Sequence, residues 1–395
     1  MNNMITAQMV QAAERIVAAL SHNASPVLRR AHQRFPENLW NGAHLIEGDG
    51  RRAALDLGQV IRADRSPSRT RAELSRAEAQ QLFDLARRRR PDFTGTNYGV
   101  TIVDSSAGPA VVRNQLGERK ETLLKIWFPE NVIINHAREC GARAPKMLYS
   151  GVDPYTGREF TIMEYVTGET RPFSDPEVLR WLPDLLDQVQ LMSAHPLPEG
   201  MKMDIPSWQQ AMIQNADNVY DGLPPWHRSR LDELGVGPLS TIVRPDHGRA
   251  GEPAVFGHND LYPQNLRFDD QKKLWILDWE NGGPSDPHYN ATLFIDRVGP
   301  LNDTTHAAIT DMWNERLSSM HPGVDTESAL SMYQKMEDWR GLVLSSGTME
   351  ERVAGDPDLL TTWAGKFEKR ISRNPDLPEF SEDDLRSILG RWVDL

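Results

Sequence analysis

Asp260, Asn265 and Asp278 are the residues whose types and spacing could do chemistry together. Asp260 lies in the segment His258-Asn259-Asp260-Leu261, Asn265 follows it by five positions, and Asp278 follows Asn265 by thirteen. A carboxylate on a loop can accept the proton of a hydroxyl group. An amide oxygen and a second carboxylate suit Mg²⁺, which prefers hard oxygen ligands and keeps several waters. Transfer of a phosphoryl group to a hydroxyl needs such a set, because the protein then mainly positions the reactants and neutralises developing charge.

Two short strands are expected to carry Asn265 and Asp278 into place. The apolar runs Leu266 to Phe268 and Leu274 to Leu277 are joined by the turn-forming residues Asp269 to Gln271, which predicts a β-hairpin. Asp260 would then lie on the loop before this hairpin, and Asp278 would lie at the end of its second strand.

The spacing of these residues is more informative than any one of them. Asp and Asn are favoured in turns, so each alone would indicate only a polar loop. The order H-x-D-L-x-x-x-N, followed by an acid after a hairpin, is the pattern of a kinase catalytic loop. We therefore predict Asp260 as the base and Asn265 and Asp278 as Mg²⁺ ligands. For His258, in the same catalytic loop, we favour support of the loop by hydrogen bonding over acid–base chemistry. A metal-ligand role is disfavoured, because no second His is suitably spaced.

The chain before residue 170 offers candidates for nucleotide binding. Gly95 and Asn97 lie in a stretch, 94–99, whose backbone could cover phosphates, although its glycines also fit a simple turn. Lys125 lies in a predicted strand, 121–127, the setting of a lysine that pairs with nucleotide phosphates. A lysine on the surface of a strand is the alternative.

A carboxylate on the following helix should hold that lysine. Glu130 and Glu139 both qualify, and we prefer Glu130 because it leaves a full helix before Pro145. Glu164 and Val166 lie at the end of a further predicted strand, where backbone groups could contact adenine. A plain buried strand is the alternative there.

The remaining pattern predicts a small sheet followed by helices. Strands are expected at 98–104, 121–127 and 160–165, with a helix opened by Pro129 and ended near Cys140. Residues 176–193 carry apolar side chains at helical spacing, and the chain beyond Gly168 is mainly helical. Two more helices are predicted at 5–20 and from Ser75, a plausible N-cap, to about Arg89.

The segment Gly257 to Leu293 resembles the aminoglycoside phosphotransferase and choline/ethanolamine kinase superfamily. The His258-to-Asn265 loop, the stretches 94–97 and 144–149, and Asp278-Trp279-Glu280 with Asp286-Pro287 carry the resemblance. It implies an α+β, bilobal, protein-kinase-like fold, with ATP as the usual donor and Mg²⁺ as cofactor. It implies the roles already given to Asp260, Asn265 and Asp278, and places Glu280 and Asp286 near the acceptor or in support of the loop.

The sequence also departs from the family pattern. Asn290-Ala291-Thr292 stands where the family commonly has Asp-Leu-Ala, so that the buttress of the loop differs. The region between Lys125 and Pro145 is short for this branch, which leaves the choice between Glu130 and Glu139 open. We predict a helical N-terminal extension at 1–90, a nucleotide-binding N-lobe with a small antiparallel sheet and one helix at 91–168, and a helical C-lobe at 169–395.

Composition restricts the class of protein. The formal net charge of −12 argues against nonspecific nucleic-acid binding, and the basic cluster 87–90 fits a helix end. Cys140 is the only cysteine, so an intrachain disulfide or a zinc site built on cysteines is excluded. The start of the chain lacks a cationic secretory signal, and no apolar run has the length of a membrane span, so we expect a cytoplasmic protein.

Three functions remain open. The first is phosphorylation of a small, cationic hydroxyl compound such as an amino alcohol or an aminoglycoside, which the negative charge and the resemblance favour. Trp275, Trp279 and Tyr289 could then bind a quaternary ammonium by cation–π contact, or belong to the core. The second is phosphorylation of Ser or Thr in a peptide. The third is a nucleotide-binding pseudokinase, which the intact set of chemical residues disfavours. The sequence does not decide between ATP and GTP or fix the oligomeric state.

Overall fold

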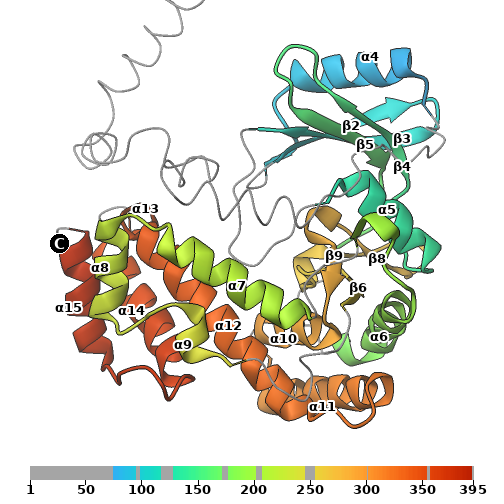
Figure 1. The fold of residues 1–395 in the computed structure, drawn as a ribbon. Helices are drawn as coiled ribbons and strands as arrows, with labels where there is room; N and C mark the ends of the chain where they lie inside the picture. The colour runs from blue at the N-terminus through green and yellow to red at the C-terminus, as the bar shows by residue number, and fades with distance from the viewer. Residues whose placement is uncertain are drawn as a thin grey trace, which may run out of the picture.

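The computed structural model describes residues 74–94, 98–116, 128–170, 177–201, 207–244, 254–299, 301–353 and 356–393. They form a small lobe built on a sheet and a larger, mainly helical lobe, an α+β fold in which the two lobes meet near helix α5 (Figure 1). The helix predicted at 5–20, the strand predicted at 121–127, and Gly95, Asn97 and Lys125 lie outside the described residues.

The small lobe is a five-stranded antiparallel sheet with strand order β1-β2-β3-β5-β4. Its strands are β1 (Phe93–Thr94), β2 (Tyr98–Ser105), β3 (Gly108–Gln115), β4 (Met147–Val152) and β5 (Glu159–Glu164). The strands predicted at 98–104 and 160–165 are confirmed. Strands β3 and β4 were not predicted, because β3 opens with Gly-Pro and both contain polar residues that mask the alternation.

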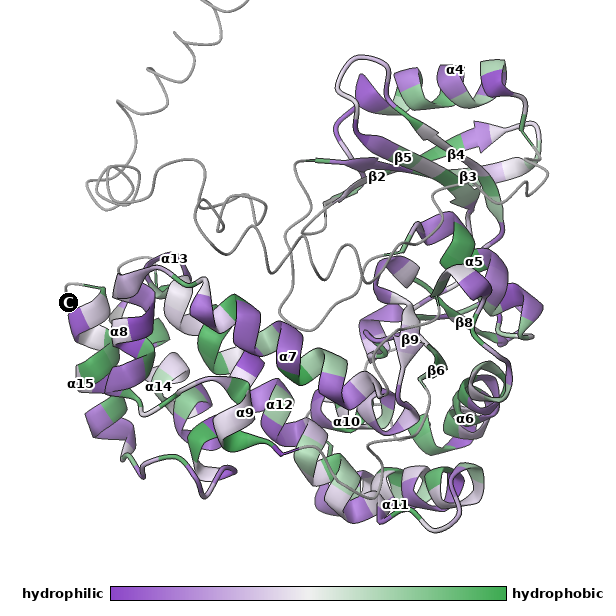
Figure 2. Cartoon of the chain, viewed as in Figure 1, coloured by the Kyte–Doolittle hydropathy of each residue, from purple (hydrophilic) through white to green (hydrophobic). Residues whose placement is uncertain are grey.

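Two helices cover the two faces of this sheet. Helix α4 (Arg76–Arg87) lies on the face away from the large lobe, and α5 (Glu130–Glu139) lies between the sheet and that lobe (Figure 1). Ser75 caps α4 by accepting a hydrogen bond from the Glu78 N–H, as predicted. The helix shows both hydrophobic and hydrophilic residues in Figure 2, and its buried side chains pack on the sheet, with the Phe83 and Phe160 rings 4.2 Å apart. Residues 76–87 therefore share a core with the small lobe.

The large lobe contains most of the helices. They are α6 (Val178–Ala194), η3 (Glu199–Met201), α7 (Trp208–Asp221), α8 (Pro225–Glu233), α9 (Leu239–Ile242), α10 (Pro287–Arg297), α11 (Asp303–Met320), α12 (Thr326–Gly347), α13 (Met349–Val353), α14 (Pro357–Ser372) and α15 (Glu382–Trp392). Helix α6 confirms the prediction for 176–193. None of the helices in the described ranges combines the length and apolar character needed to cross a membrane.

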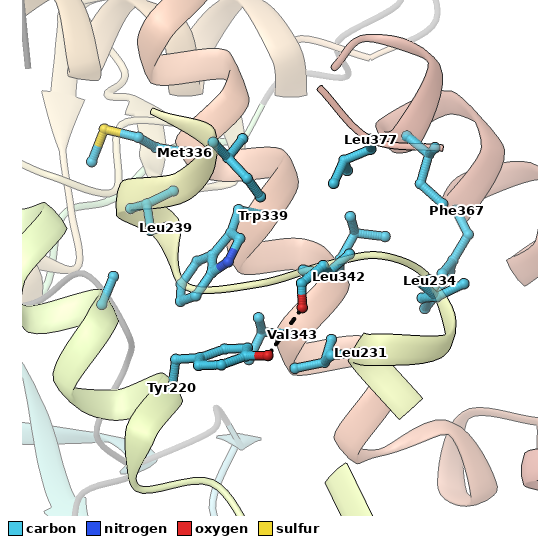
Figure 3. Packing of buried hydrophobic residues seen from close by; sticks show 14 of the residues in the cluster. Tyr220, Leu231, Leu234, Leu239, Met336, Trp339, Leu342, Val343, Phe367 and Leu377 are labelled. Atoms are coloured by element: carbon cyan, nitrogen blue, oxygen red, sulfur yellow. Dashed lines mark hydrogen bonds between the residues drawn. The ribbon is translucent and has the colours of Figure 1, made fainter. Parts of the chain in front are cut away.

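Helix α12 is the central element of the helical end of this lobe. It contacts α8, α9, α10 and α14, and its fully buried Trp339 packs among apolar residues that include Leu239 and Leu342 (Figure 3). The Trp339 indole N–H donates to the Gly237 carbonyl at 2.9 Å. Because α10 also packs on α12, the position of α10 depends on this core.

Two small antiparallel strand pairs lie where the lobes meet. Strand β6 (Val255–Gly257) pairs with β9 (Gly283–Ser285), and β7 (Leu266–Phe268) pairs with β8 (Leu274–Ile276), which confirms the predicted hairpin. The chain that leaves the small lobe pairs with this hairpin, since Glu169 and Phe268 exchange two backbone hydrogen bonds of 3.0 and 2.9 Å. The lobe connection is thus fixed to the hairpin.

We predict that Gly168→Ala destabilises the protein far more than Gly157→Ala. Both glycines have positive φ, +109° and +72°, but a Cβ at Gly168 would lie 1.9 Å from the Phe268 carbonyl oxygen, whereas nothing lies within 4 Å at Gly157. Gly157→Ala should cost about 1–2 kcal/mol, and Gly168→Ala about 3 kcal/mol or more because a backbone clash adds to the conformational cost. Urea denaturation of both variants checks this, and equal losses would contradict the contact between the connection and the hairpin.

A second prediction concerns pH and His227. This side chain is buried against α12, with Nε2 2.9 Å from the Val343 carbonyl and 2.8 Å from Ser346 Oγ, and burial lowers its pKa to about 4. Because the unfolded chain takes up the proton more readily, stability present above pH 6.5 is lost as the pH falls towards 4, by up to about 3 kcal/mol. His227→Gln should show a smaller loss over this window in denaturation curves. His306→Gln, at an exposed position, is the control, and an unchanged pH slope in His227→Gln would contradict the prediction.

Candidate active site

The loop after β6 is shaped by close packing on β9 and α10. Gly257 is required there, because a Cβ would lie 2.7 Å from both the Ser285 side chain and Asn290 Nδ2. Asn259 has a left-handed backbone (φ 59°), and its N–H donates to Asn290 Oδ1 at 2.9 Å. Its side-chain amide donates to the Pro284 carbonyl at 3.0 Å. Asn290, where the family pattern has Asp, therefore buttresses the loop through its amide oxygen.

Asp260, the predicted base, follows Asn259 in this loop. Asn281 Nδ2 donates to Asp260 Oδ2 at 2.9 Å, and Arg297 Nη1 lies 3.0 Å from Oδ1. Asn265 Nδ2 donates to the Asp260 backbone carbonyl at 2.9 Å. The Asp260 side chain keeps 23% of its surface exposed, so solvent or a substrate can reach a carboxylate that is held at both oxygens.

His258 supports this loop from the inside. It is fully buried, its Nε2–H donates to the Leu277 carbonyl at 2.8 Å, and its ring packs edge-on against Trp279. Burial lowers the pKa of His258, which favours the neutral form of the ring. These contacts favour the supporting role over acid–base chemistry.

Asn265 and Asp278 are brought together by the hairpin. The Leu277 N–H donates to the Asn265 carbonyl at 2.7 Å, and Asp278 follows with a left-handed backbone (φ 58°). Since the Asn265 amide nitrogen is used by the Asp260 carbonyl, its oxygen is the atom left for a cation. The donors are hard oxygens and fit Mg²⁺. No cluster of three or more His, Cys, Asp or Glu that could hold a metal occurs in the described part of the chain.

Arg113 of β3 was not predicted, yet it links the lobes at this site. Its guanidinium pairs with Glu130 on α5, lies 2.8 Å from Asp278 Oδ1 and 3.4 Å from Glu280 Oε2. Burial opposes its charge, but Glu130 and the other two acids outweigh that cost and raise its pKa. The signal available in the sequence was an arginine after two valines of a strand.

The two candidate glutamates of α5 have different surroundings. Glu130 is buried and contacts Arg113, whereas the Glu139 side chain is 73% exposed and lies 3.5 Å from His136. This favours Glu130 as the inward-facing carboxylate. Its predicted partner Lys125 is outside the described residues.

The other predicted residues are spread around this centre. Glu164 ends β5, where it exchanges two hydrogen bonds with Lys146, and Val166 is buried in the connection to the large lobe. Glu280 lies on η5 (Trp279–Asn281) beside Arg113. Asp286 is buried and caps α10, accepting from the His288 N–H and ring and from the Tyr333 hydroxyl. These contacts favour a supporting role for Asp286 over direct substrate binding.

We predict that Arg113→Met destabilises the protein by roughly 3–5 kcal/mol, because it leaves the buried Glu130 carboxylate and the less buried Asp278 and Glu280 without their shared cation. The stability of Arg113→Lys should lie between that of the unmodified protein and that of Arg113→Met. A lysine keeps the charge, but its single ammonium cannot contact three acids as the fork of a guanidinium does. Adding Glu130→Gln to Arg113→Met should recover part of the loss. Urea denaturation gives the free energy of unfolding of all four proteins. An Arg113→Met variant as stable as the unmodified protein would show that the contact does not contribute to stability.

A family model described as "Phosphotransferase enzyme family" matches residues 86–320. The search of curated protein sequences gave no match.

Solved structures similar to this chain include three kinases. A choline/ethanolamine kinase family protein from Mesorhizobium loti is 17% identical with a TM-score of 0.43, covering 76% of this chain and 91% of its own. Choline kinase LicA from Streptococcus pneumoniae is 14% identical with a TM-score of 0.48, covering 76% and 99%. Aminoglycoside phosphotransferase APH(3'')-Id from Streptomyces rimosus is 15% identical with a TM-score of 0.40, covering 69% and 98%.

Proposed function

This chain belongs to the phosphotransferase enzyme family, and on that premise we propose that it transfers the γ-phosphoryl group of ATP to a hydroxyl group of a small molecule, with Mg²⁺ as cofactor. The observation that carries the proposal is the junction of Asp260, Asn265 and Asp278. Asn265 contacts Asp260 through its side chain and the residue before Asp278 through its backbone. This arrangement supports a site in which one loop and one hairpin hold Asp260 as the base beside two side chains that would bind Mg²⁺.

The residues divide the work of the reaction. Asp260 accepts the proton of the acceptor hydroxyl as the hydroxyl oxygen bonds to the γ-phosphorus and the bond to the β-phosphate oxygen breaks, which gives a phosphate ester and ADP. Asn265 and Asp278 would hold Mg²⁺, which supplies charge neutralisation at the nucleotide phosphates when it is bound. The buried His258 holds the loop in place through its hydrogen bond to the Leu277 carbonyl.

Nucleotide binding is assigned to the small lobe. Arg113 supplies a buried guanidinium beside Asp278, where it can meet nucleotide phosphates. Gly95, Asn97 and Lys125 remain candidates for phosphate contacts, and the backbone at Glu164 and Val166 remains the candidate for adenine. Glu280 stays a candidate on the acceptor side.

The site supports a hydroxyl group on the acceptor more strongly than it supports any particular charge on the acceptor. The net charge of −12 favours a cationic acceptor such as an amino alcohol or an aminoglycoside. Around Asp260, however, the carboxylate of Glu337 is already paired with Arg297 and Arg340. Trp279 and Tyr289 are core residues, 0% and 3% exposed, and do not line a surface for a quaternary ammonium. Neutral and anionic hydroxyl compounds therefore belong in any acceptor screen.

The test is acceptor-dependent release of ADP from ATP and Mg²⁺. The panel contains choline, ethanolamine, aminoglycosides, neutral polyols, hydroxy acids and Ser/Thr peptides. We expect turnover with a small hydroxyl compound and a loss of roughly 10²–10⁴-fold in Asp260→Asn, because the base is removed while the shape is kept. Nucleotide affinity should stay unchanged in that variant.

Asp311→Asn, an isosteric change at an exposed position of α11, is the matched control and should keep full activity. Turnover only with peptides would assign the protein to peptide phosphorylation instead. Nucleotide binding without turnover on any acceptor, unaffected by Asp260→Asn, would support a pseudokinase and overturn the proposal.

A further inference from the structure

Arg297, the last residue of α10, joins the predicted base to helix α12. Its Nη1 lies 3.0 Å from Asp260 Oδ1, and its Nη2 lies 3.2 Å from Glu337 Oε2. The same guanidinium lies over the Tyr262 ring, 5.3 Å from the ring centre, so the side chain is held on a third side. One planar group therefore contacts the loop that carries the base and a helix of the large-lobe core.

Glu337 is a fixed anchor for this contact. Its side chain is only 6% exposed, it accepts hydrogen bonds from Arg340 Nε and Nη2, and it accepts one from the Tyr289 hydroxyl at 2.8 Å. Burial opposes its ionisation, but Arg340 and Arg297 outweigh burial and lower the pKa of Glu337 to about 2. An ionised, immobile carboxylate thus holds one end of the Arg297 fork.

Asp260 needs such support because it lies on a loop and is partly exposed. Asn281 and Arg297 donate to different oxygens of the carboxylate, which fixes the plane of the group. Each carboxylate oxygen can accept more than one hydrogen bond, so a lone pair remains for the acceptor hydroxyl. A displacement of about 1 Å in a reacting group can cost about 100-fold in rate.

We propose that Arg297 is a positioning residue for the catalytic carboxylate, with Glu337 as its anchor. The inference rests on the proposed function. Arginine suits the task because its rigid fork reaches two carboxylates at once, whereas a lysine offers one point charge on a flexible stem. Arg297 acts through Asp260 and does not itself take part in the transfer.

The kinetic test uses the full chain and the acceptor that gives the highest turnover with the unmodified protein. Arg297→Met should lower kcat by about 100-fold while KM for ATP changes by less than about threefold, because the base is misplaced and the nucleotide site is not. Arg297→Lys should recover part of kcat, and Glu337→Gln should lose less than Arg297→Met. Arg316→Met is the matched control, since Arg316 has a similar exposure of 23% and pairs with Asp187 between α11 and α6.

A merely structural arginine would behave differently. Equal kcat in Arg297→Met and Arg316→Met, or a higher kcat in Arg297→Met, would overturn the inference. A kcat loss that Arg297→Lys fails to improve, with KM for ATP raised in proportion, would also overturn it, because that pattern reports general disruption of the site.

A denaturation cycle separates this inference from the proposed function. In urea, the shift in midpoint for Asp260→Asn with Arg297→Met should be smaller than the sum of the two single shifts, because both remove the same contact. Additive shifts would show that the contact is absent and overturn the inference alone. Coupled shifts with no turnover on any acceptor would overturn the proposed function, and the positioning role of Arg297 with it.

Discussion

Carboxylates gathered at one junction need cations, and this requirement organises the site. A base and metal ligands must lie close together, yet like charges in a partly buried setting repel and raise the energy of the folded chain. Arginines from different elements neutralise these acids. Arg113 of β3 reaches Glu130, Asp278 and Glu280, while Arg297 of α10 reaches Asp260 and Glu337. Their planar forks contact two or three acids at once, which a lysine could not do. The ion pairs therefore fix the acidic side chains in place as well as neutralising them.

These pairs also connect the lobes. Arg113 belongs to the small lobe and its partners Asp278 and Glu280 belong to the large one, so the orientation of the lobes and the arrangement of the site are coupled. On the other side, Glu337 lies on α12, whose Trp339 is buried in the helical core of Figure 3. The loop that carries Asp260 is thus supported by the buried His258, by the Pro284 carbonyl of β9, by Asn290 of α10, and by α12 through Arg297. A small loop gains its rigidity from elements far away in the sequence.

The sequence predicted the parts of the site that depend on local spacing. The loop from His258 to Asn265, the hairpin after it and Asp278 lie within about twenty residues, and the helix at Ser75 is set by its own cap. Arg113 could not be placed this way, because its partner Asp278 is 165 positions away and strand β3 shows no clean alternation. Arg297 and Glu337 are 40 positions apart on different helices, and only their packing shows that they share a contact. The contact between Asp286 and Tyr333 could not be predicted from the sequence either, since Tyr333 lies on α12.

We propose that a phosphoryl group passes from ATP to a hydroxyl of a small molecule at Asp260. The most direct measurement follows the label from ATP labelled in its γ-phosphoryl group, incubated with Mg²⁺, the full-length protein and the acceptor panel. We expect the label to appear in a phosphate ester of one class of acceptor, and Asp260→Asn to slow its appearance by roughly 10²–10⁴-fold. Label that stays in ATP, or that is released only as inorganic phosphate with every acceptor, would contradict it.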